Sequence, residues 1–260
     1  MRSSPWGGRI RRGRLLVIGD IHGCAADLRC LLDDVAPEAG DRVVFLGDYI
    51  DRGPASAEVI DEVLAVRQAC PDTICLRGNH EEMLLGYLGL DGSRGSIFLR
   101  AGGAATVSSY GLDPAKVTPE ALAAELPEAH LRFFRDELLF SHLEGPFLFV
   151  HAGVRPRIPI SSQDREDLLW IREEFLSTDH GLEEVVVFGH TPQRRVQLSA
   201  SRRIAMDSGA VYGGHLSCLD LTRGILHEVP HDSGGAWRCD TIRELRRAGV
   251  PDDWALGIRR

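Results

Sequence analysis

The 260-residue sequence predicts an α/β domain in which strands alternate with helices around a largely parallel sheet. Short runs rich in Val, Ile, Leu and Phe recur along the chain, and a Gly stands near the end of almost every run. The segments between the first three runs carry apolar residues at helical spacing instead. Alternation of this kind is typical of parallel sheets that are buried on both faces.

The first part of the chain shows the alternation most clearly. The run RLLVIGD ends at Asp20, and the helical pattern CAADLRCLLDDVA follows it. The run RVVFLGD ends at Asp48, and a turn at Gly53 and Pro54 precedes the helical pattern SAEVIDEVLAVRQA. A third run, DTICLRGN, ends at Asn79. Three strands with two intervening helices are therefore expected to open the domain.

The rest of the chain is less regular. Residues 83–142 are more helical, and we expect them to form an insertion that covers the site and not a separate domain. Strand-like runs resume in PFLFVHAG, EVVVFGH and RRIAMDSG. We expect residues 14–235 to form the domain, with an N-terminal tail at 1–13 and a C-terminal extension at 236–260, both Arg-rich and peripheral.

Composition narrows the classes of function. The net charge of −8 argues against nucleic acid as an obligatory partner, and no apolar run approaches the ~18–20 residues that span a membrane. The basic start of the chain lacks the pattern of a signal peptide. Six cysteines without a C-x-x-C motif are expected to be reduced thiols, which predicts a cytoplasmic protein. The sequence leaves the oligomeric state open.

Polar side chains follow the strand-like runs, at the edge where ligands bind in open α/β sheets. They are carboxylates, imidazoles and one amide, namely Asp20, His22, Asp48, Asn79, His80, His151 and His190. An isolated Asp or His at a strand end is usually a cap or a satisfied polar group, but repetition at several strand ends favours a site. Such donors suit Mn, Fe or Zn. His80 directly follows Asn79 and need not bind a metal, which leaves six candidate ligands. Because one metal cannot take six ligands and keep an open position, we expect two metals that share one carboxylate.

Five motifs resemble those of the metal-dependent Ser/Thr phosphoprotein phosphatases, and are closest to bacterial and phage members within the calcineurin-like metallophosphoesterase superfamily. In family order they are GDIHG (19–23), GDYIDRG (47–53), RGNHE (77–81), HAG (151–153) and GHTP (189–192). The resemblance covers roughly residues 14–225 and extends to DLLWIREEFL and MDSGAVYGG. It implies a single domain with a central β-sandwich of mixed sheets flanked by helices.

The resemblance also implies two divalent metal ions, with Mn expected first and Fe or Zn as alternatives. The first metal would be held by Asp20, His22 and Asp48, and the second by Asp48, Asn79, His151 and His190. Asp48 would then bridge the two ions. Two metals ~3.5–4 Å apart can present a bridging hydroxide in line with phosphorus.

Four further residues receive roles from the same motifs. His80 would act as the general acid that protonates the leaving oxygen, and Asp51 would orient it. Arg52 and Arg172 would clamp phosphate oxygens, for which planar guanidinium groups are well suited. Two structural alternatives stay open, since His80 could lack a catalytic duty and Arg172 could instead form an ion pair on a surface helix.

Several other polar residues receive no firm role. Arg77 could form a structural salt bridge or contact phosphate, and Tyr212 could line the pocket or simply pack. The remaining histidines lack ligand partners at useful spacing and are expected to be packed or at the surface. They are His130, His142, His180, His215, His227 and His231.

The motifs favour a phosphatase that acts on phosphoserine and phosphothreonine, with phosphotyrosine as a further option, so a phosphorylated protein or peptide is the expected partner. The phosphodiesterases of the superfamily usually carry G-H-x-H, whereas Pro192 stands at the second His position here. A scaffold without chemistry would be expected to lose ligands, yet all the ligand positions are filled.

A symmetrical dinucleoside-tetraphosphate hydrolase is the main alternative. Such enzymes are similar through GDIHGC but typically lack the Asp of D-R-G and have G-N-H-D, where this chain has GNHE. A serine alkoxide needs a strong general acid in order to leave, whereas a nucleotide phosphate leaves well without one. The presence of Asp51 with His80 therefore favours hydrolysis of monoesters.

Overall fold

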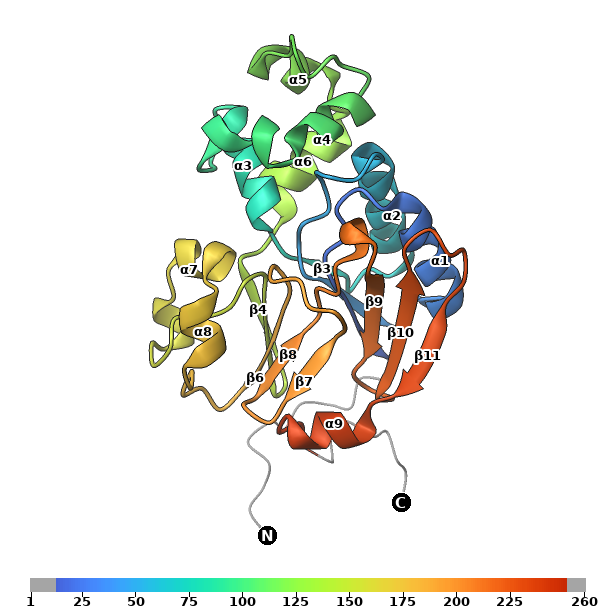
Figure 1. Cartoon of the computed structure of the whole chain (residues 1–260), viewed down its shortest axis with the longest axis vertical. Coiled ribbons are helices and arrows are strands. Elements are labelled where there is room, and N and C mark those ends of the chain that lie inside the picture. The colour runs from blue at the N-terminus through green and yellow to red at the C-terminus, as the bar shows by residue number, and fades with distance from the viewer. Residues whose placement is uncertain (1–12, 252–260) are drawn as a thin grey trace.

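The computed structural model describes residues 13–251, whose strands form two mixed sheets packed face to face (Figure 1). In the first sheet, β1 (Leu15–Ile18), β2 (Arg42–Phe45) and β3 (Ile74–Cys75) run parallel. Antiparallel strands β9 (His215–Asp220), β10 (Ile225–Pro230) and β11 (Trp237–Asp240) extend the sheet beyond β1. The strand order is β11-β10-β9-β1-β2-β3.

The second sheet has a similar plan. Strands β5 (Phe147–Val150), β6 (Val185–Phe188) and β8 (Arg203–Ala205) run parallel in its centre. The edge strands β4 (Ser141–Glu144) and β7 (Gln197–Ser199) are antiparallel to their neighbours, and the order is β4-β5-β6-β8-β7. This arrangement confirms the α/β class and the β-sandwich of mixed sheets. It corrects the simpler prediction, made from the strand pattern alone, of one largely parallel sheet.

The alternation of side chains along each strand explains the layers. Leu15 and Val17 of β1 pack between the sheets, together with Phe147 and Phe149 of β5. Leu16 and Ile18 of β1 point to the opposite face, where α1 (Ala25–Val35) and α2 (Ser56–Ala69) cover them. The outer face of the second sheet is covered by α7 (Arg165–Trp170) and α8 (Glu173–Ser177), on the opposite side of the molecule (Figure 1).

A helical segment lies at the upper end of the sandwich in Figure 1. It contains α3 (Asn79–Tyr87), α4 (Gly103–Ser109), α5 (Pro119–Glu125) and α6 (Glu128–Arg132), with short 3-10 turns at Gly95–Ile97 and Leu99–Ala101 and a π-helical turn at Phe133–Glu137. Its apolar side chains join the core beneath α1 and α2, as Phe133 does against Tyr49 with ring centroids 5.4 Å apart. The segment is thereby packed onto the end of the sandwich where the parallel strands finish.

The last described residues take part in the fold. Strand β11 pairs with β10, and α9 (Ile242–Arg247) buries Leu245 at the lower end of the core between the sheets (Figure 1). The predicted tail at 1–13 lies almost entirely outside the described residues, as does the end of the predicted extension at 236–260. All six cysteines are unpaired thiols. Among residues 13–251, the helices are too short or too polar to cross a bilayer.

Candidate metal centre

The seven strand-end side chains identified in the sequence come together at one edge of the sandwich. Asp20 and His22 follow β1, Asp48 follows β2, Asn79 and His80 begin α3, His151 follows β5 and His190 follows β6. Each of the seven is at most 5% exposed. Because the parallel strands of both sheets end here, residues far apart in the sequence converge on one buried site.

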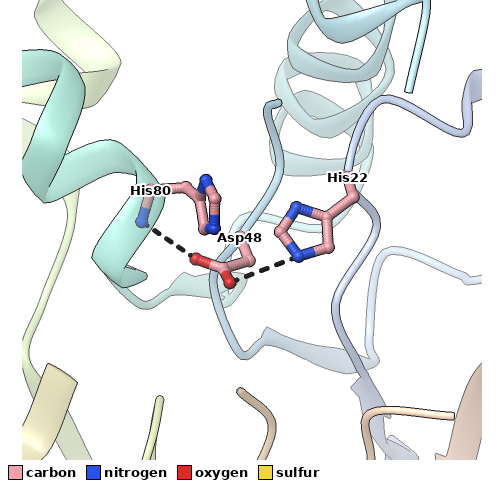
Figure 2. Close-up of side chains that lie close together, drawn as sticks. All are labelled: His22, Asp48 and His80. Carbon is pink, nitrogen blue, oxygen red and sulfur yellow. Dashed lines mark hydrogen bonds and ion pairs between the residues drawn. The ribbon is translucent and has the colours of Figure 1, made fainter. Parts of the chain in front are cut away.

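The carboxylate of Asp48 lies at the middle of the cluster. His22 Nε2 is 3.4 Å from Asp48 Oδ2, and His151 Nε2 is 3.4 Å from Asp48 Oδ1. The backbone N–H of His80 also donates to Asp48 Oδ1, at 3.1 Å. Figure 2 shows Asp48 between His22 and His80, with one carboxylate oxygen directed to each. Asp48 therefore occupies the position that a bridging ligand requires.

A second group of donors lies on the other side of Asp48. Asn79 Oδ1 is 3.0 Å from His151 Nε2 and 2.8 Å from His190 Nδ1. Candidate ligand atoms of Asp48, His151 and His190 all lie within 4.8 Å of one another, as do those of His22, Asp48 and His80. The two groups share Asp48, as a pair of metals with one bridging carboxylate would require, but the group with His22 contains His80, where the prediction had Asp20.

Three features of the structure fit divalent cations at this cluster. Asp20 Oδ1 is buried without a hydrogen-bond partner, while its Oδ2 accepts the backbone N–H of His190 at 2.9 Å. His22 Nδ1 lies 2.9 Å from the carbonyl of Ile50, and His151 Nδ1 lies 2.9 Å from that of Leu46. In a neutral imidazole, donation from Nδ1–H to a carbonyl leaves the lone pair of Nε2 for a metal, and it fixes the orientation of the ring.

The electrostatics point in the same direction. Burial and the nearby Asp207 raise the pKa of Asp20 well above its usual range. Burial would also raise the pKa of Asp48, but His151 and His80 hold it well below the usual range. Burial lowers the pKa of His22 to about 3, so this imidazole is neutral, as a metal ligand must be. Burial also tends to lower the pKa of His151, but the charge of Asp48 raises it to about 9, so a metal that binds His151 would have to displace a proton. Buried carboxylates at this density need positive charge nearby.

The backbone around the cluster is unusually constrained. Five residues of the site other than glycine have a positive φ, namely His22, Asp48, Asp51, Arg52 and His190. Such conformations are costly outside glycine and concentrate at functional sites. Two glycines bring the backbone close to the carboxylates. A Cβ at Gly78 would lie 2.2 Å from Asp48 Oδ1, and one at Gly189 would lie 2.0 Å from Asp20 Oδ1.

The predicted acid pair is formed next to the ligands. His80 Nδ1 lies 2.6 Å from Asp51 Oδ2, and both side chains are fully buried or nearly so. Burial tends to lower the pKa of His80, but the charge of Asp48 and the hydrogen bond to Asp51 raise it overall. This geometry favours a protonated imidazole whose Nδ1–H is committed to Asp51 and whose Nε2 remains free to donate.

Both predicted phosphate clamps reach the cluster. Arg52 Nη1 contacts His22 Nε2, and Arg172 Nε donates to His190 Nε2 at 3.0 Å. Arg172 stands at the N-terminal cap of α8 and is exposed, and Glu174, one of its alternative partners, pairs with Arg155 instead. The two guanidinium groups therefore lie beside two different predicted ligands, Arg52 at His22 and Arg172 at His190.

The residues without a firm role are also placed. Arg77 forms an ion pair with Glu82 at 3.0 Å, which is the structural alternative considered for it. Tyr212 is 63% exposed, and the guanidinium of Arg52 lies 5.5 Å from the centroid of its ring. His130, His227 and His231 pair with aspartates, and His142, His180 and His215 lie against aromatic rings.

Sequence reasoning missed three residues that support the site. Glu81 accepts hydrogen bonds from four backbone N–H groups around it, and its signal was the last letter of RGNHE, which was used only to separate families. Asp207 is buried beside Asp20, and burial raises its pKa to about 6; it stands in the run RRIAMDSG, but the sequence assigned it no role. Thr106 contacts Asp51 from α4, and no local pattern points to it.

Comparison with known proteins agrees with this geometry. The family model described as calcineurin-like phosphoesterase matches residues 13–219. The asymmetrical bis(5'-nucleosyl)-tetraphosphatase PrpE of Halalkalibacterium halodurans is 27% identical over 232 residues, which cover 78% of this chain and 88% of that protein. A symmetrical bis(5'-nucleosyl)-tetraphosphatase of Burkholderia pseudomallei is 32% identical over 142 residues, which cover 55% of this chain and 43% of that protein.

Solved structures show the same fold. One crystal structure, assigned provisionally as a diadenosine tetraphosphatase, superposes with a TM-score of 0.64 at 25% identity, covering 86% of this chain and 96% of that one. A protein serine/threonine phosphatase of Saccharomyces cerevisiae superposes with a TM-score of 0.55 at 16% identity, covering 90% of this chain and 81% of that one. At that identity the second similarity concerns the fold alone.

Proposed function

The chain belongs to the calcineurin-like phosphoesterase family, and within this family we propose that it hydrolyses dinucleoside polyphosphates such as diadenosine tetraphosphate. The observation that carries this proposal is the similarity to the asymmetrical bis(5'-nucleosyl)-tetraphosphatase, which covers 88% of that protein. The structure assigned provisionally as a diadenosine tetraphosphatase supports the same class of substrate. The motifs alone favoured phosphoserine and phosphothreonine as substrates, whereas the similarity to the bis(5'-nucleosyl)-tetraphosphatases favours the alternative, a nucleotide substrate.

We infer that the strand-end cluster holds two divalent ions. Asp20, His22 and Asp48 would bind one, and Asp48, Asn79, His151 and His190 the other. When bound, such ions supply positive charge and a water activated at neutral pH. Oxygen and imidazole donors accept Mn, Fe and Zn alike, and Mn is the first ion to test.

The chain itself would bind the phosphates and supply a proton. Arg52 and Arg172 lie where their N–H groups can bind the non-bridging oxygens of the phosphate under attack. His80 would hold a proton at Nε2 and donate it to the departing oxygen, while Asp51 keeps its Nδ1–H in place. The side chains of the cluster around Asp48 are buried, and the low dielectric constant of such surroundings would strengthen each of these charge interactions.

A second candidate is hydrolysis of phosphomonoesters on a protein or peptide. The specific observation in its favour is the buried His80–Asp51 pair at 2.6 Å, because an alkoxide leaving group depends on a general acid more than a nucleotide phosphate does. Phosphorylated proteins or peptides would then be the partners of this enzyme.

The deciding experiment measures Mn²⁺-dependent products from diadenosine tetraphosphate and from a phosphothreonine peptide, side by side. ATP with AMP would indicate asymmetrical cleavage, two ADP symmetrical cleavage, and faster phosphate release from the peptide would overturn the nucleotide proposal. The Asp48→Asn variant, purified in parallel, controls for contaminating phosphatases because it should lose both activities.

A further inference from the structure

The carboxylate of Asp51 receives a hydrogen bond from a residue of the helical insertion. Thr106 lies on α4 and is fully buried, and its Oγ1 is 2.6 Å from Asp51 Oδ1. The other carboxylate oxygen, Oδ2, is 2.6 Å from His80 Nδ1. Each oxygen of Asp51 therefore has one close side-chain donor, the imidazole on one side and the threonine hydroxyl on the other.

The hydroxyl protons can be assigned by counting donors. Thr106 has one hydroxyl proton, and a carboxylate can only accept, so this proton goes to Asp51 Oδ1. The contact of Ser56 Oγ with Thr106 Oγ1 at 3.0 Å must then be donated by Ser56. Thr106 Oγ1 also accepts the backbone N–H of Asp51 at 2.9 Å. The hydroxyl of Thr106 thus holds both the side chain and the backbone of Asp51.

The same segment of the insertion holds the neighbouring phosphate clamp. The backbone N–H of Arg52 donates to the carbonyl of Gly102 at 3.1 Å. Asp51 and Arg52 have φ values of 73° and 70°, a conformation that is costly for both residues. Hydrogen bonds with residues 102–106 therefore help to hold the strained loop that carries Asp51 and Arg52.

We propose that Thr106 is a positioning residue for the acid pair, and that its hydroxyl fixes the Asp51 carboxylate in the orientation that holds His80 for proton donation. The helical insertion then contributes to catalysis, because it positions Asp51 in addition to packing onto the end of the sandwich. The inference rests on the proposed phosphoester hydrolysis, but it does not depend on whether the natural substrate is a nucleotide or a phosphoprotein.

The test compares Thr106→Val, which removes the hydroxyl at nearly constant volume, with Thr106→Ser, which keeps it. Ser109→Ala is the matched control, because Ser109 lies on the same helix and its hydroxyl contacts backbone groups of Ala57 and Thr106 and not Asp51. The substrates are phenyl phosphate, which has a poor leaving group, and p-nitrophenyl phosphate, which has a good one. Neither measurement requires knowledge of the natural substrate.

We expect Thr106→Val to lower kcat on phenyl phosphate about 10-fold and on p-nitrophenyl phosphate less than about 3-fold, since only the poor leaving group depends strongly on the acid. KM should stay unchanged, and Thr106→Ser and Ser109→Ala should behave like the parent. Equal losses on both substrates, or a loss that Thr106→Ser shares, would show a structural role only and overturn the proposal.

A spectroscopic measurement gives a second, independent outcome. In the Zn²⁺-loaded protein, NMR should show a downfield, slowly exchanging Nδ1 proton of His80, shared with Asp51. This signal should persist in Thr106→Ser and be broadened or lost in Thr106→Val, and its full retention in Thr106→Val would contradict the proposal. If Thr106→Val does not fold, Thr106→Ala replaces it in both measurements. If the enzyme cleaves neither aryl phosphate, the NMR result decides alone.

Discussion

Glu81 holds Asp48 through the backbone, because Glu81 Oε2 accepts a hydrogen bond from the Asp48 N–H at 3.0 Å. The same oxygen accepts the N–H of Gly78 at 2.9 Å, and Oε1 accepts that of Tyr49 at 2.9 Å. Glu81 is fully buried. One carboxylate therefore joins the loop after β2 to the start of α3, and these two segments carry Asp48, Asn79 and His80.

Glu81→Gln should destabilise the protein and disturb the metal centre. The amide NH₂ of Gln cannot accept, and each oxygen of Glu81 accepts two backbone N–H groups, so two buried N–H groups lose their partner. Each such loss costs about 1–3 kcal/mol. Urea unfolding of the metal-free protein measures the loss, with the exposed Glu58→Gln as a control that should change stability by less than about 0.5 kcal/mol. If Glu81→Gln unfolds at the parent's urea concentration, the anchoring role is wrong.

Asp48→Asn should abolish turnover and weaken binding of both metals, because the shared negative charge is lost. The fold should survive, since Asp48 has φ of 51° and Asn tolerates the left-handed conformation as well as Asp does. Metal content after dialysis measures the effect, and we expect fewer than one bound ion per chain. Retention of two tightly bound ions would show that Asp48 does not bridge them.

The ligand cluster could be predicted from the sequence because its signal is local. Asp20, Asp48, His151 and His190 each stand within two residues of an apolar run, and parallel strands bring such positions to one edge. Thr106 gave no such signal. It contacts Asp51 across 55 positions of sequence, and a Thr on a short helix has the same local pattern whether it only packs or positions another side chain.

The division of strands between two sheets could not be predicted from the strand pattern. The strands Leu15–Ile18 and Phe147–Val150 are both four residues long and completely buried. A continuously apolar strand shows that both of its faces are covered, but not which strand pairs with it or whether a helix or a second sheet covers each face. The β-sandwich was predicted from the resemblance of the motifs to a known family and not from the periodicity of the strands.

Arg52→Lys should weaken phosphate binding although the charge is kept. Lys lacks the planar fork of donors and cannot stack in the same way beside Tyr212, whose ring lies 5.5 Å from the Arg52 guanidinium. We expect kcat/KM to fall about 10-fold, which corresponds to about 1.4 kcal/mol, mainly through KM. Arg29→Lys on the outer surface of α1 is the matched control and should leave kinetics unchanged. An unchanged KM in Arg52→Lys would remove Arg52 from the phosphate site.

The contact between α1 and β11 should make stability depend on pH in acid. Asp34 on α1 accepts hydrogen bonds from His227 Nδ1 and from Arg238 Nη2, both at 2.6 Å. The bond from Arg238 lowers the pKa of Asp34 from its ordinary value, against a smaller opposing effect of burial. The folded pKa is thus below the unfolded one, about 3.9. The stabilisation is therefore fully present above that unfolded value and disappears as the pH falls through the folded pKa.

Asp34→Asn should accordingly lose about 1 kcal/mol of stability at pH 7 and at pH 5. The loss should become smaller only in stronger acid, as the pH falls through the lowered folded pKa of Asp34 and the parent's carboxylate also becomes neutral. Urea unfolding at pH 7, at pH 5 and at a series of lower pH values measures the difference. The proteins are metal-free, so the pH dependence of metal binding does not enter the comparison. Asp33→Asn is the matched control because Asp33 is the exposed neighbour on the same helix, and it should show no such pattern. A difference in stability between the parent and Asp34→Asn that stays constant over the whole acid titration of the parent would mean that Asp34 acts through packing and not through its charge. Strand β11 would then be held to α1 independently of this ion pair.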